Sequence, residues 1–321
     1  HALKGVKDYT NADKVLEEYY SKEFNTEEFI DKLTRTVPYY YTIKGVNTGA
    51  SIGDFGISFF GEDVVFASIR NSESPNYKWN QKPYLDLYKA SVSNDVTFES
   101  VEPFSTEINS DTHESNATFT SDGKIMYFSR THNKQVKIGD AKYAVVKIYR
   151  AEFIDDEWTN IEPLPFTNDT YSTQHPYLDE ENKRLYFSSD MPGSLGSFDI
   201  FYVDIDGDNF GEPINLGETI NTQHREQFPF LTNDNILYFA SDGHEGLGGL
   251  DIFMAYLKED GNSTPQNLGD TINSGLDDFA FVLKDSVEKG YFSFCAVLKG
   301  SKKQFIQDGC HVFQVVISNL K

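Results

Sequence analysis

The sequence predicts an all-β fold: a five-bladed β-propeller that is closed by an N-terminal strand and preceded by a short helical segment. Three observations support this prediction. A short aromatic strand recurs five times, each copy has the same ordered neighbours, and the last copy lacks an outer strand that the beginning of the chain can supply. The 321 residues are enough for one large repetitive domain.

The aromatic strand is the most regular part of the repeat. Measured between its phenylalanines, the period is 62, 59, 52 and 53 residues, which suits a four-stranded blade with its loops. The copies are VVFAS ending at Ser68, MYFSR ending at Arg130, LYFSS ending at Ser189, LYFAS ending at Ser241 and GYFSF ending at Phe294.

Each aromatic strand is the second of four short strands, which we name A, B, C and D in chain order. Strand A is HPYL from His175 in the third copy and FPFL from Phe228 in the fourth. A tight turn leads to strand B, and a glycine-rich loop leads to strand C, which is FDIFYVDI from Phe198 or LDIFMAYL from Leu250. Strand D follows as EPINLGETIN or TPQNLGDTIN. Four antiparallel strands of this kind form one propeller blade.

The fifth copy has no strand D, because the chain ends at Lys321 directly after its strand C. The segment YYYTIKGVNTG, residues 39–49, precedes the first strand A and has no strands A, B and C of its own. Its Val-Asn-Thr, residues 46–48, resembles the Ile-Asn-Ser or Ile-Asn-Thr that ends other D strands. We therefore expect residues 39–48 to complete blade five, so that residues 39–321 form one closed ring without an open edge.

Residues 1–38 have a helical pattern. Apolar side chains recur at helical spacing behind Asn11 and Asn25, which are plausible N-caps, and Pro38 ends the pattern. The spacing predicts two short helices with Val15, Leu16, Tyr19, Tyr20, Phe29, Ile30 and Leu33 on their apolar faces. These helices either pack on the flank of the propeller or form the end of a preceding helical domain.

The charge balance limits the partners. There are 28 Lys and Arg against 50 Asp and Glu, which gives a net charge of −22, so nucleic acid is not expected as a partner. No apolar run reaches the roughly 18 residues of a membrane-spanning helix, and we expect no direct membrane span in this sequence. Because it opens at His1 without an apolar signal stretch, we interpret it as a processed or cloned piece of a longer protein.

Blades three and four carry a family resemblance. The strings SSDMPGSLGSFDIFYVDIDGDNFGEPINLGETINT, residues 188–222, and ASDGHEGLGGLDIFMAYLKEDGNSTPQNLGDTINS, residues 240–274, are similar to WD-like propeller repeats of the TolB type. They resemble the form found in OmpA-family outer-membrane proteins linked to type IX secretion, the PorE-like proteins. Blades one, two and five depart from the pattern, and blade two has THNKQVKIGDAKYAVVKIY in place of the glycine-rich loop.

The resemblance implies a non-catalytic interaction scaffold. A protein of this kind would lie in the periplasm, associated with the outer membrane, and would bind envelope proteins of the secretion or gliding machinery. The fold by itself does not imply such a role.

Three motifs that suggest chemistry have simpler interpretations. The signature acids Asp190, Asp199, Asp242 and Asp251 stand at glycine-rich turns, where a short carboxylate accepts backbone N–H groups. The acidic segment 204–212 lacks the glycine at position six of a calcium loop, since Gly207 falls at position four. The G-x-S-x-G at residues 49–53 is followed by a strand instead of the helix of a nucleophile elbow. We therefore predict no catalytic residue, no metal and no cofactor.

Cys295 and Cys310 are the two cysteines of the chain, and the alignment places them at the end of strand B and the start of strand C in blade five. Antiparallel neighbours at the base of a hairpin come within disulfide range. A disulfide there would fit the oxidising periplasm that the resemblance implies, and the alternative is a pair of buried thiols.

The residues just before strand A form the candidate binding site. In a propeller the D–A and B–C loops gather on one face around the central channel, so these residues are expected to ring its mouth. Such a ring would bind a cation, a Lys or Arg of a partner, or a glycan, and crowding would raise some carboxylate pKa values. The alternative is a solvated mouth whose acids reflect the overall charge. The candidates are Asp54, Glu114, His175, His224, Arg225, Glu226, Asp277 and Asp278.

Two functions from different classes follow. The leading hypothesis is the non-catalytic scaffold, which the resemblance supports. The alternative is a five-bladed glycan-binding protein or glycoside hydrolase that uses two acids among Asp54, Glu114, Glu226 and Asp278 as an acid and base pair. Against it, these acids fill equivalent positions in the repeat, and a group repeated in several blades usually serves what the blades share.

Overall fold

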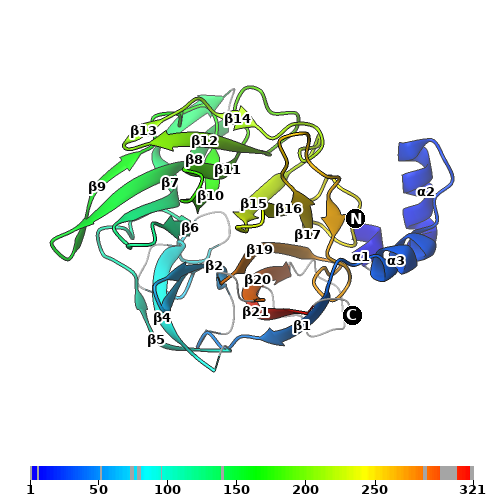
Figure 1. Ribbon diagram of the computed structural model, residues 1–321, viewed down its shortest axis with the longest axis horizontal. Coiled ribbons are helices and arrows are strands. Elements are labelled where there is room, and N and C mark those ends of the chain that lie inside the picture. The colour runs from blue at the N-terminus through cyan, green and yellow to red at the C-terminus, as the bar shows by residue number, and fades with distance from the viewer. Residues whose placement is uncertain are drawn as a thin grey trace.

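The computed structural model describes residues 2–5, 7–50, 53–72, 76–77, 81–94, 96–138, 141–284, 288–296 and 309–318. Its strands form five antiparallel sheets that surround a common centre (Figure 1). The predicted five-bladed propeller is confirmed.

Each blade follows the order A, B, C, D outward from the centre. Blade one contains β2 (Phe55–Phe60), β3 (Asp63–Ser68), β4 (Asp86–Ser93) and β5 (Thr97–Pro103). Blade two contains β6 (Glu114–Phe119), β7 (Ile125–Ile138), β8 (Ala141–Ile154) and β9 (Glu157–Pro163). Blade three contains β10 (Thr173–Asp179), β11 (Arg184–Ser189) and β12 (Asp199–Asp206), which pairs with the short β13 (Asn209–Phe210) and β14 (Ile214–Asn215). Blade four contains β15 (Glu226–Leu231), β16 (Ile236–Ser241), β17 (Asp251–Tyr256) and β18 (Gln266–Asn267).

Blade five combines one strand from the N-terminal region of the chain with three strands from the C-terminal region. It contains β19 (Asp277–Leu283), β20 (Lys289–Ala296), β21 (Gly309–Ser318) and, as its outer strand, β1 (Tyr40–Gly45). β1 runs antiparallel to β21, from Tyr40 opposite Ser318 to Gly45 opposite Phe313. The prediction that an N-terminal strand closes the ring is therefore confirmed.

The middle of each B strand is apolar and buried because both of its faces are covered. Each lies between strands A and C of its own blade and packs against the neighbouring blades, so it lacks the polar alternation of a one-sided sheet. The repeated phenylalanine at the middle of each strand is at most 2% exposed: Phe66, Phe128, Phe187, Phe239 and Phe292.

The helical segment contains α1 (Ala2–Gly5), α2 (Tyr9–Tyr20) and α3 (Thr26–Arg35), which lie outside the ring beside blades four and five (Figure 1). Asn25 caps α3 as expected, since its side chain accepts from the Glu28 N–H at 3.0 Å. Asp8, not Asn11, caps α2. The Lys4 ammonium is buried and donates to Glu245 Oε2 at 2.9 Å and to the Gly246 carbonyl at 3.0 Å, which joins the helices to the flank of blade four.

Candidate functional site

The predicted ring of acids lies inside the molecule. Asp54, Glu114, Glu226 and Asp278 are each at most 2% exposed, and Thr173 stands at the equivalent position of blade three. The sequence placed these residues around the mouth of the channel, either as a crowded binding ring or as a solvated mouth, whereas the four acids are buried. The physical reason is that each carboxylate binds the D–A loop of its own junction between blades.

Glu226 illustrates this arrangement. Its Oε2 accepts the Thr222 N–H at 2.8 Å, and its Oε1 accepts the hydroxyls of Thr222 and Ser241, each at 2.7 Å. The Thr222 hydroxyl and N–H belong to the end of the Ile-Asn-Thr motif, four residues before the acid. The carboxylate therefore folds the loop between blades three and four back onto strand A.

The same junction recurs elsewhere in the ring. Glu114 accepts the Ser110 N–H at 3.1 Å and its hydroxyl at 2.5 Å, and Asp278 accepts the Ser274 N–H at 2.5 Å and its hydroxyl at 2.8 Å. Asp54 accepts the Thr48 hydroxyl. In blades one and two an arginine completes the junction: Arg70 donates to Asp54 at 2.7 Å and Arg130 donates to Glu114 at 2.9 Å.

Burial dominates the electrostatics of these acids. It raises the pKa of Glu114, Glu226 and Asp278 to about 7, while the hydrogen bonds from the loops lower each pKa. For Glu114 the charge of Arg130 also lowers the pKa. Desolvation, and not the crowding of acids around a mouth, is therefore the main cause.

The asparagine of the repeated motif has a matching structural role. Asn221 Oδ1 accepts the Ile200 N–H at 2.8 Å and its Nδ2 donates to the Ile200 carbonyl at 3.0 Å. Asn273 and Ile252 repeat this pair at 2.7 and 2.9 Å. The amide side chain thus continues the hydrogen bonding of strand C where strand D has ended.

The remaining candidates, which are two histidines, Arg225 and Asp277, do not share the buried position of the four acids. His224 is exposed on the D–A loop, and Arg225 beside it donates to Asp242 Oδ2 from Nε at 2.9 Å and from a terminal nitrogen at 2.7 Å. Asp277 Oδ1 accepts the Leu250 N–H at 2.9 Å. His175 is not on this face at all, because it lies within β10 and lines the central channel.

The signature acids accept loop hydrogen bonds, in agreement with their structural interpretation. Asp199 accepts the Leu195 N–H at 2.7 Å, Asp251 accepts the Gly248 N–H at 3.0 Å, and Asp190 accepts the Ser172 N–H at 2.6 Å. Within the described ranges no three His, Cys, Asp or Glu side chains come together as a metal-binding group.

A cavity of about 260 Å³ occupies the centre of the ring, between the five A strands β2, β6, β10, β15 and β19. Each of these strands has one residue with a left-handed backbone at a β-bulge, two residues after the ring position: Gly56, Asn116, His175, Phe228 and Ala280. Proline follows the bulge residue in blades three and four, where the inner edge of strand A needs no ladder donor.

Side chains link neighbouring A strands around this cavity. The Ser58 hydroxyl donates to the Ala117 carbonyl, the Leu178 N–H donates to Thr118 Oγ1 at 3.2 Å, and the Tyr177 hydroxyl donates to the Leu231 carbonyl at 2.6 Å. No Asp or Glu is found among the described residues that line the cavity. The cavity therefore lacks the carboxyl pair of a glycoside hydrolase in that part of its wall.

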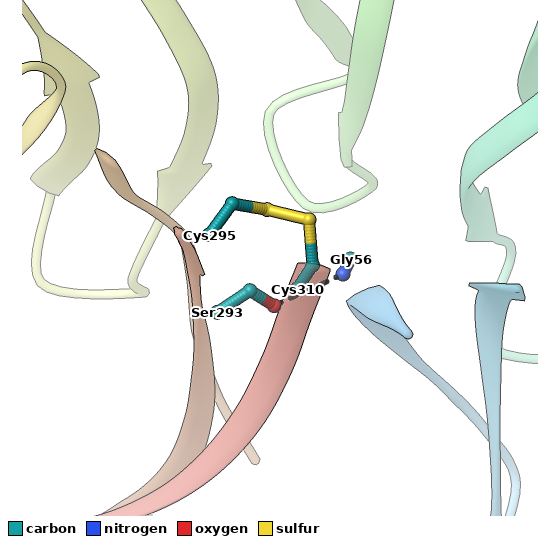
Figure 2. Close-up of a disulfide and its surroundings, with 4 residues drawn as sticks. All are labelled: Gly56, Ser293, Cys295 and Cys310. Atoms are coloured by element: carbon teal, nitrogen blue, oxygen red, sulfur yellow. Dashed lines mark hydrogen bonds between the residues drawn. A yellow bond between two sulfur atoms is a disulfide. The ribbon is translucent and has the colours of Figure 1, made fainter. Parts of the chain in front are cut away.

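The two cysteines meet in blade five. Cys295 of β20 stands opposite Cys310 of β21, and their sulfur atoms form a disulfide (Figure 2). Close by, the Ser293 hydroxyl accepts the Gly56 N–H at 3.2 Å, and the Cys310 carbonyl accepts the Gly53 N–H at 2.9 Å. The disulfide therefore lies at the contact between blade five and blade one.

Sequence comparison identifies no relative. No protein-family model matches the chain, and no curated protein matches it. None of the helices in the part of the chain that the structure describes is long and apolar enough to cross a membrane.

Solved structures share the propeller fold. The α-L-arabinofuranosidase from Lactobacillus brevis has 13% identity and a TM-score of 0.55, covering 83% of this chain and 90% of its own. The catalytic domain of a GH62 α-L-arabinofuranosidase from Coprinopsis cinerea has 8% identity and a TM-score of 0.52, covering 88% of this chain and 98% of its own. A protein described as TolB from Agrobacterium tumefaciens has 16% identity and a TM-score of 0.45, covering 80% of this chain and 78% of its own. At these identities the likeness to the two arabinofuranosidases concerns the fold alone.

Proposed function

We propose that this chain is a non-catalytic interaction propeller of the bacterial envelope. In this proposal it belongs to an OmpA-family protein of the periplasm, associated with the outer membrane, and binds envelope proteins of the type IX secretion or gliding machinery. The residues of blades three and four that resemble WD-like repeats of such proteins support this assignment.

One observation carries the non-catalytic part of the proposal. The acids that a hydrolase would need at the channel are each buried at their own, equivalent junction between two blades. They are Asp54, Glu114, Glu226 and Asp278. A general acid or base must come within hydrogen-bond reach of the substrate atom with which it exchanges a proton, and these carboxyl groups are at most 2% exposed.

The test is capture of a partner. The purified chain is immobilised and exposed to periplasmic and outer-membrane extract of a bacterium with type IX secretion. A propeller of unrelated sequence and similar negative charge is the control, because it reveals binding that depends on charge alone. We expect this chain, and not the control, to retain a specific component of the secretion or gliding machinery. Recovery of the same proteins on both, or of none, contradicts the proposal.

The alternative is a glycan-binding protein or glycoside hydrolase, and one observation favours it. Burial raises the pKa of Glu114, Glu226 and Asp278 to about 7, a value that suits a general acid near neutral pH. Release of reducing ends from plant and bacterial polysaccharides, with Asp54→Ala and Glu226→Ala as controls, tests it. Turnover that both variants lose while remaining folded by circular dichroism would favour the hydrolase.

A further inference from the structure

Blade two has a longer hairpin between its strands B and C than the other blades. Strands β7 and β8 each have 14 residues, whereas the other B and C strands that the structure describes have six to ten. Their pairing continues as far as Ile138 opposite Ala141. Blades three and four have a short glycine-rich loop at this place. Residues 131–147 are therefore an addition to the common repeat, which we call the blade-two hairpin.

The base of the hairpin is fixed to the two neighbouring D–A loops. On one side, the ammonium groups of Lys134 and Lys147 both donate to the carboxylate of Asp169, at 2.5 and 2.7 Å. On the other side, the Thr131 N–H donates to the His113 carbonyl at 2.9 Å. A hairpin that is held at its base before a partner arrives loses less freedom on binding, which favours its use as a recognition surface.

Beyond this base the hairpin has outer edges without a neighbouring strand. β6 is paired with β7 up to Arg130, and β9 is paired with β8 from Tyr149 onward. Within the described part of the chain, no third strand pairs with residues 132–138 or 141–145. The extra residues of a bulge, 132–134, belong to β7, so β8 has the more regular edge. Such an edge is a template on which an extended segment of another protein can form a further strand.

Side chains near this edge are open to solvent. Asn133, Gln135 and Ala144 are exposed, and the ring of Tyr143 on β8 is 53% exposed. An aromatic side chain beside a free strand edge can pack against a side chain of an added strand, and such cross-strand pairs stabilise a sheet. The edge of β8 therefore offers both backbone groups and an aromatic contact.

The hairpin is basic in an acidic protein. Residues 131–147 contain four lysines and one aspartate, a net charge of +3, whereas the whole chain has a net charge of −22. Two of the lysines share the single carboxylate of Asp169 at the base. The other two, Lys137 and Lys142, stand directly opposite each other in the register of the strands. Like charges at opposed positions destabilise a hairpin, so this pair gains stability from a negatively charged partner.

These features select an acidic strand of a protein as the occupant. Lysines along a free edge discourage pairing with neutral or basic strands, and they leave an acidic strand as the complement. An anionic membrane fits less well, because the chain as a whole is strongly negative and Tyr143 is the only large apolar side chain exposed among the described residues of the hairpin. A second copy of the chain is disfavoured by repulsion between two charges of −22.

We propose that the blade-two hairpin binds an acidic, extended segment of a partner protein, which adds as a further strand along the free edge of β8. The negative charges of that segment complement the charges of Lys137 and Lys142. This inference rests on the proposed function, because it assigns the surface that receives a partner and the chemistry that the partner presents.

The test measures binding of defined peptides to the purified chain, by calorimetry and by amide chemical shifts. The probe is an eight-residue peptide that alternates glutamate and valine, and a peptide that alternates lysine and valine is its control. We expect the acidic peptide to bind with a stoichiometry of one, to shift the amides of β8, and to bind more weakly as the salt concentration rises.

N-methylated peptides separate strand addition from attraction between charges. Two copies of the acidic peptide carry N-methyl groups on alternate residues, one copy on each edge of its strand. We expect one copy to lose binding and the other to retain it, because methylation removes the N–H donors from one edge and leaves the charge unchanged.

Paired substitutions in the chain test the role of the lysines. Lys137→Gln with Lys142→Gln removes both charges and should weaken binding of the acidic peptide about tenfold, whereas Lys137→Arg with Lys142→Arg keeps the charges and should retain the affinity. Lys14→Gln with Lys32→Gln, at exposed positions of α2 and α3, changes the net charge equally and should leave the affinity unchanged. Circular dichroism establishes that each variant is folded.

Several outcomes would overturn the inference. They are failure of the acidic peptide to bind or to bind better than the basic one, equal binding of the two N-methylated copies, and full affinity of the Lys137→Gln, Lys142→Gln variant. Binding of phosphatidylglycerol vesicles by the hairpin without binding of the acidic peptide would assign it to a membrane instead.

Capture from extract distinguishes this inference from the proposed function. Binding of the acidic peptide by a chain that captures no envelope protein would contradict the proposed function and leave the inference standing. Capture of the same envelope protein by the unmodified chain and by the Lys137→Gln, Lys142→Gln variant would support the proposed function and overturn the inference.

Discussion

Glu226 accepts two hydrogen bonds from Thr222, one from the backbone N–H at 2.8 Å and one from the hydroxyl at 2.7 Å. The pair is four residues apart, and the same spacing joins Ser110 to Glu114 and Ser274 to Asp278. The acid that precedes strand A therefore stabilises the junction between two blades through these hydrogen bonds. The predictions below follow from this junction, from the disulfide and from the closing strand.

Removal of the Glu226 side chain should destabilise the propeller. Glu226→Ala leaves the Thr222 N–H and hydroxyl and the Ser241 hydroxyl without their shared acceptor at a buried junction. We expect a loss of about 2–4 kcal/mol in the free energy of unfolding, measured by urea denaturation. The exposed Glu218→Ala is the control and should change the unfolding free energy by less than about 0.5 kcal/mol. Equal stability of the two variants would show that the junction does not depend on this acid.

Glu226 should also make stability depend on pH. Burial raises its folded-state pKa to about 7, above the ordinary glutamate value of about 4.3, so between these two values the folded state holds a proton that the unfolded state has lost. The contribution of Glu226 is therefore fully present below about pH 4 and is lost as the pH rises to about 7.

The isosteric variant Glu226→Gln isolates this contribution, because it cannot titrate. The unfolding free energy of the unmodified chain should fall by a few kcal/mol more than that of the variant between about pH 4.5 and pH 7.5, because burial raises the pKa of Glu226 to about 7 in the folded state only. Denaturation at four pH values across this window measures the difference. Parallel pH profiles would mean that Glu226 ionises in the native state as it does in the unfolded chain.

Reduction of the disulfide should destabilise blade five and its contact with blade one. Cys295 and Cys310 are separated by 15 residues, and closing a loop of that length stabilises a protein by about 3 kcal/mol. We expect a reducing agent to lower the unfolding temperature of the unmodified chain and to leave a Cys295→Ser, Cys310→Ser double variant unaffected. Titration of two free thiols in the untreated, unfolded chain would contradict the disulfide.

The closing strand should matter more than the helices that precede it. Removal of residues 1–48 deletes β1 and exposes the edge of β21 along the six residues that pair with it. We expect this deletion to lower the unfolding free energy by roughly 3 kcal/mol or more, the sum of the lost cross-strand pairs, and to promote aggregation. Removal of residues 1–38 alone keeps β1 and is the matched control. Light scattering and urea denaturation compare the two, and equal behaviour would contradict the role of β1.

Residue patterns predicted the ring and its closure but not the state of the acids. The recurrence of the aromatic strand around Phe187 and Phe239 is a property of neighbouring residues in the chain, and so is the resemblance of residues 46–48 to the ends of the D strands. The spacing of Thr222 and Glu226 was also visible, and it could have indicated that the acid binds its own loop, as a capping residue does.

The left-handed backbone at Asn116 and His175 could not be recognised in the same way. Both stand at a bulge whose left-handed backbone is imposed by the pairing of β6 with β7 and of β10 with β11. The same position holds glycine in blade one and alanine in blade five, so residue type gives no signal.

The sequence alone determined that this protein is a five-bladed propeller whose fifth blade is completed from the N-terminal side, because strand periodicity and repeat length are written in the order of the residues. Only the tertiary structure decided that the repeated acids are buried and bind the D–A loops at the blade junctions. It also decided that a cavity lies between the A strands, whose described lining residues include no Asp, Glu, Lys or Arg. Burial and unmet hydrogen bonds depend on how side chains from different blades fit together, and the order of residues along one chain does not state that fit.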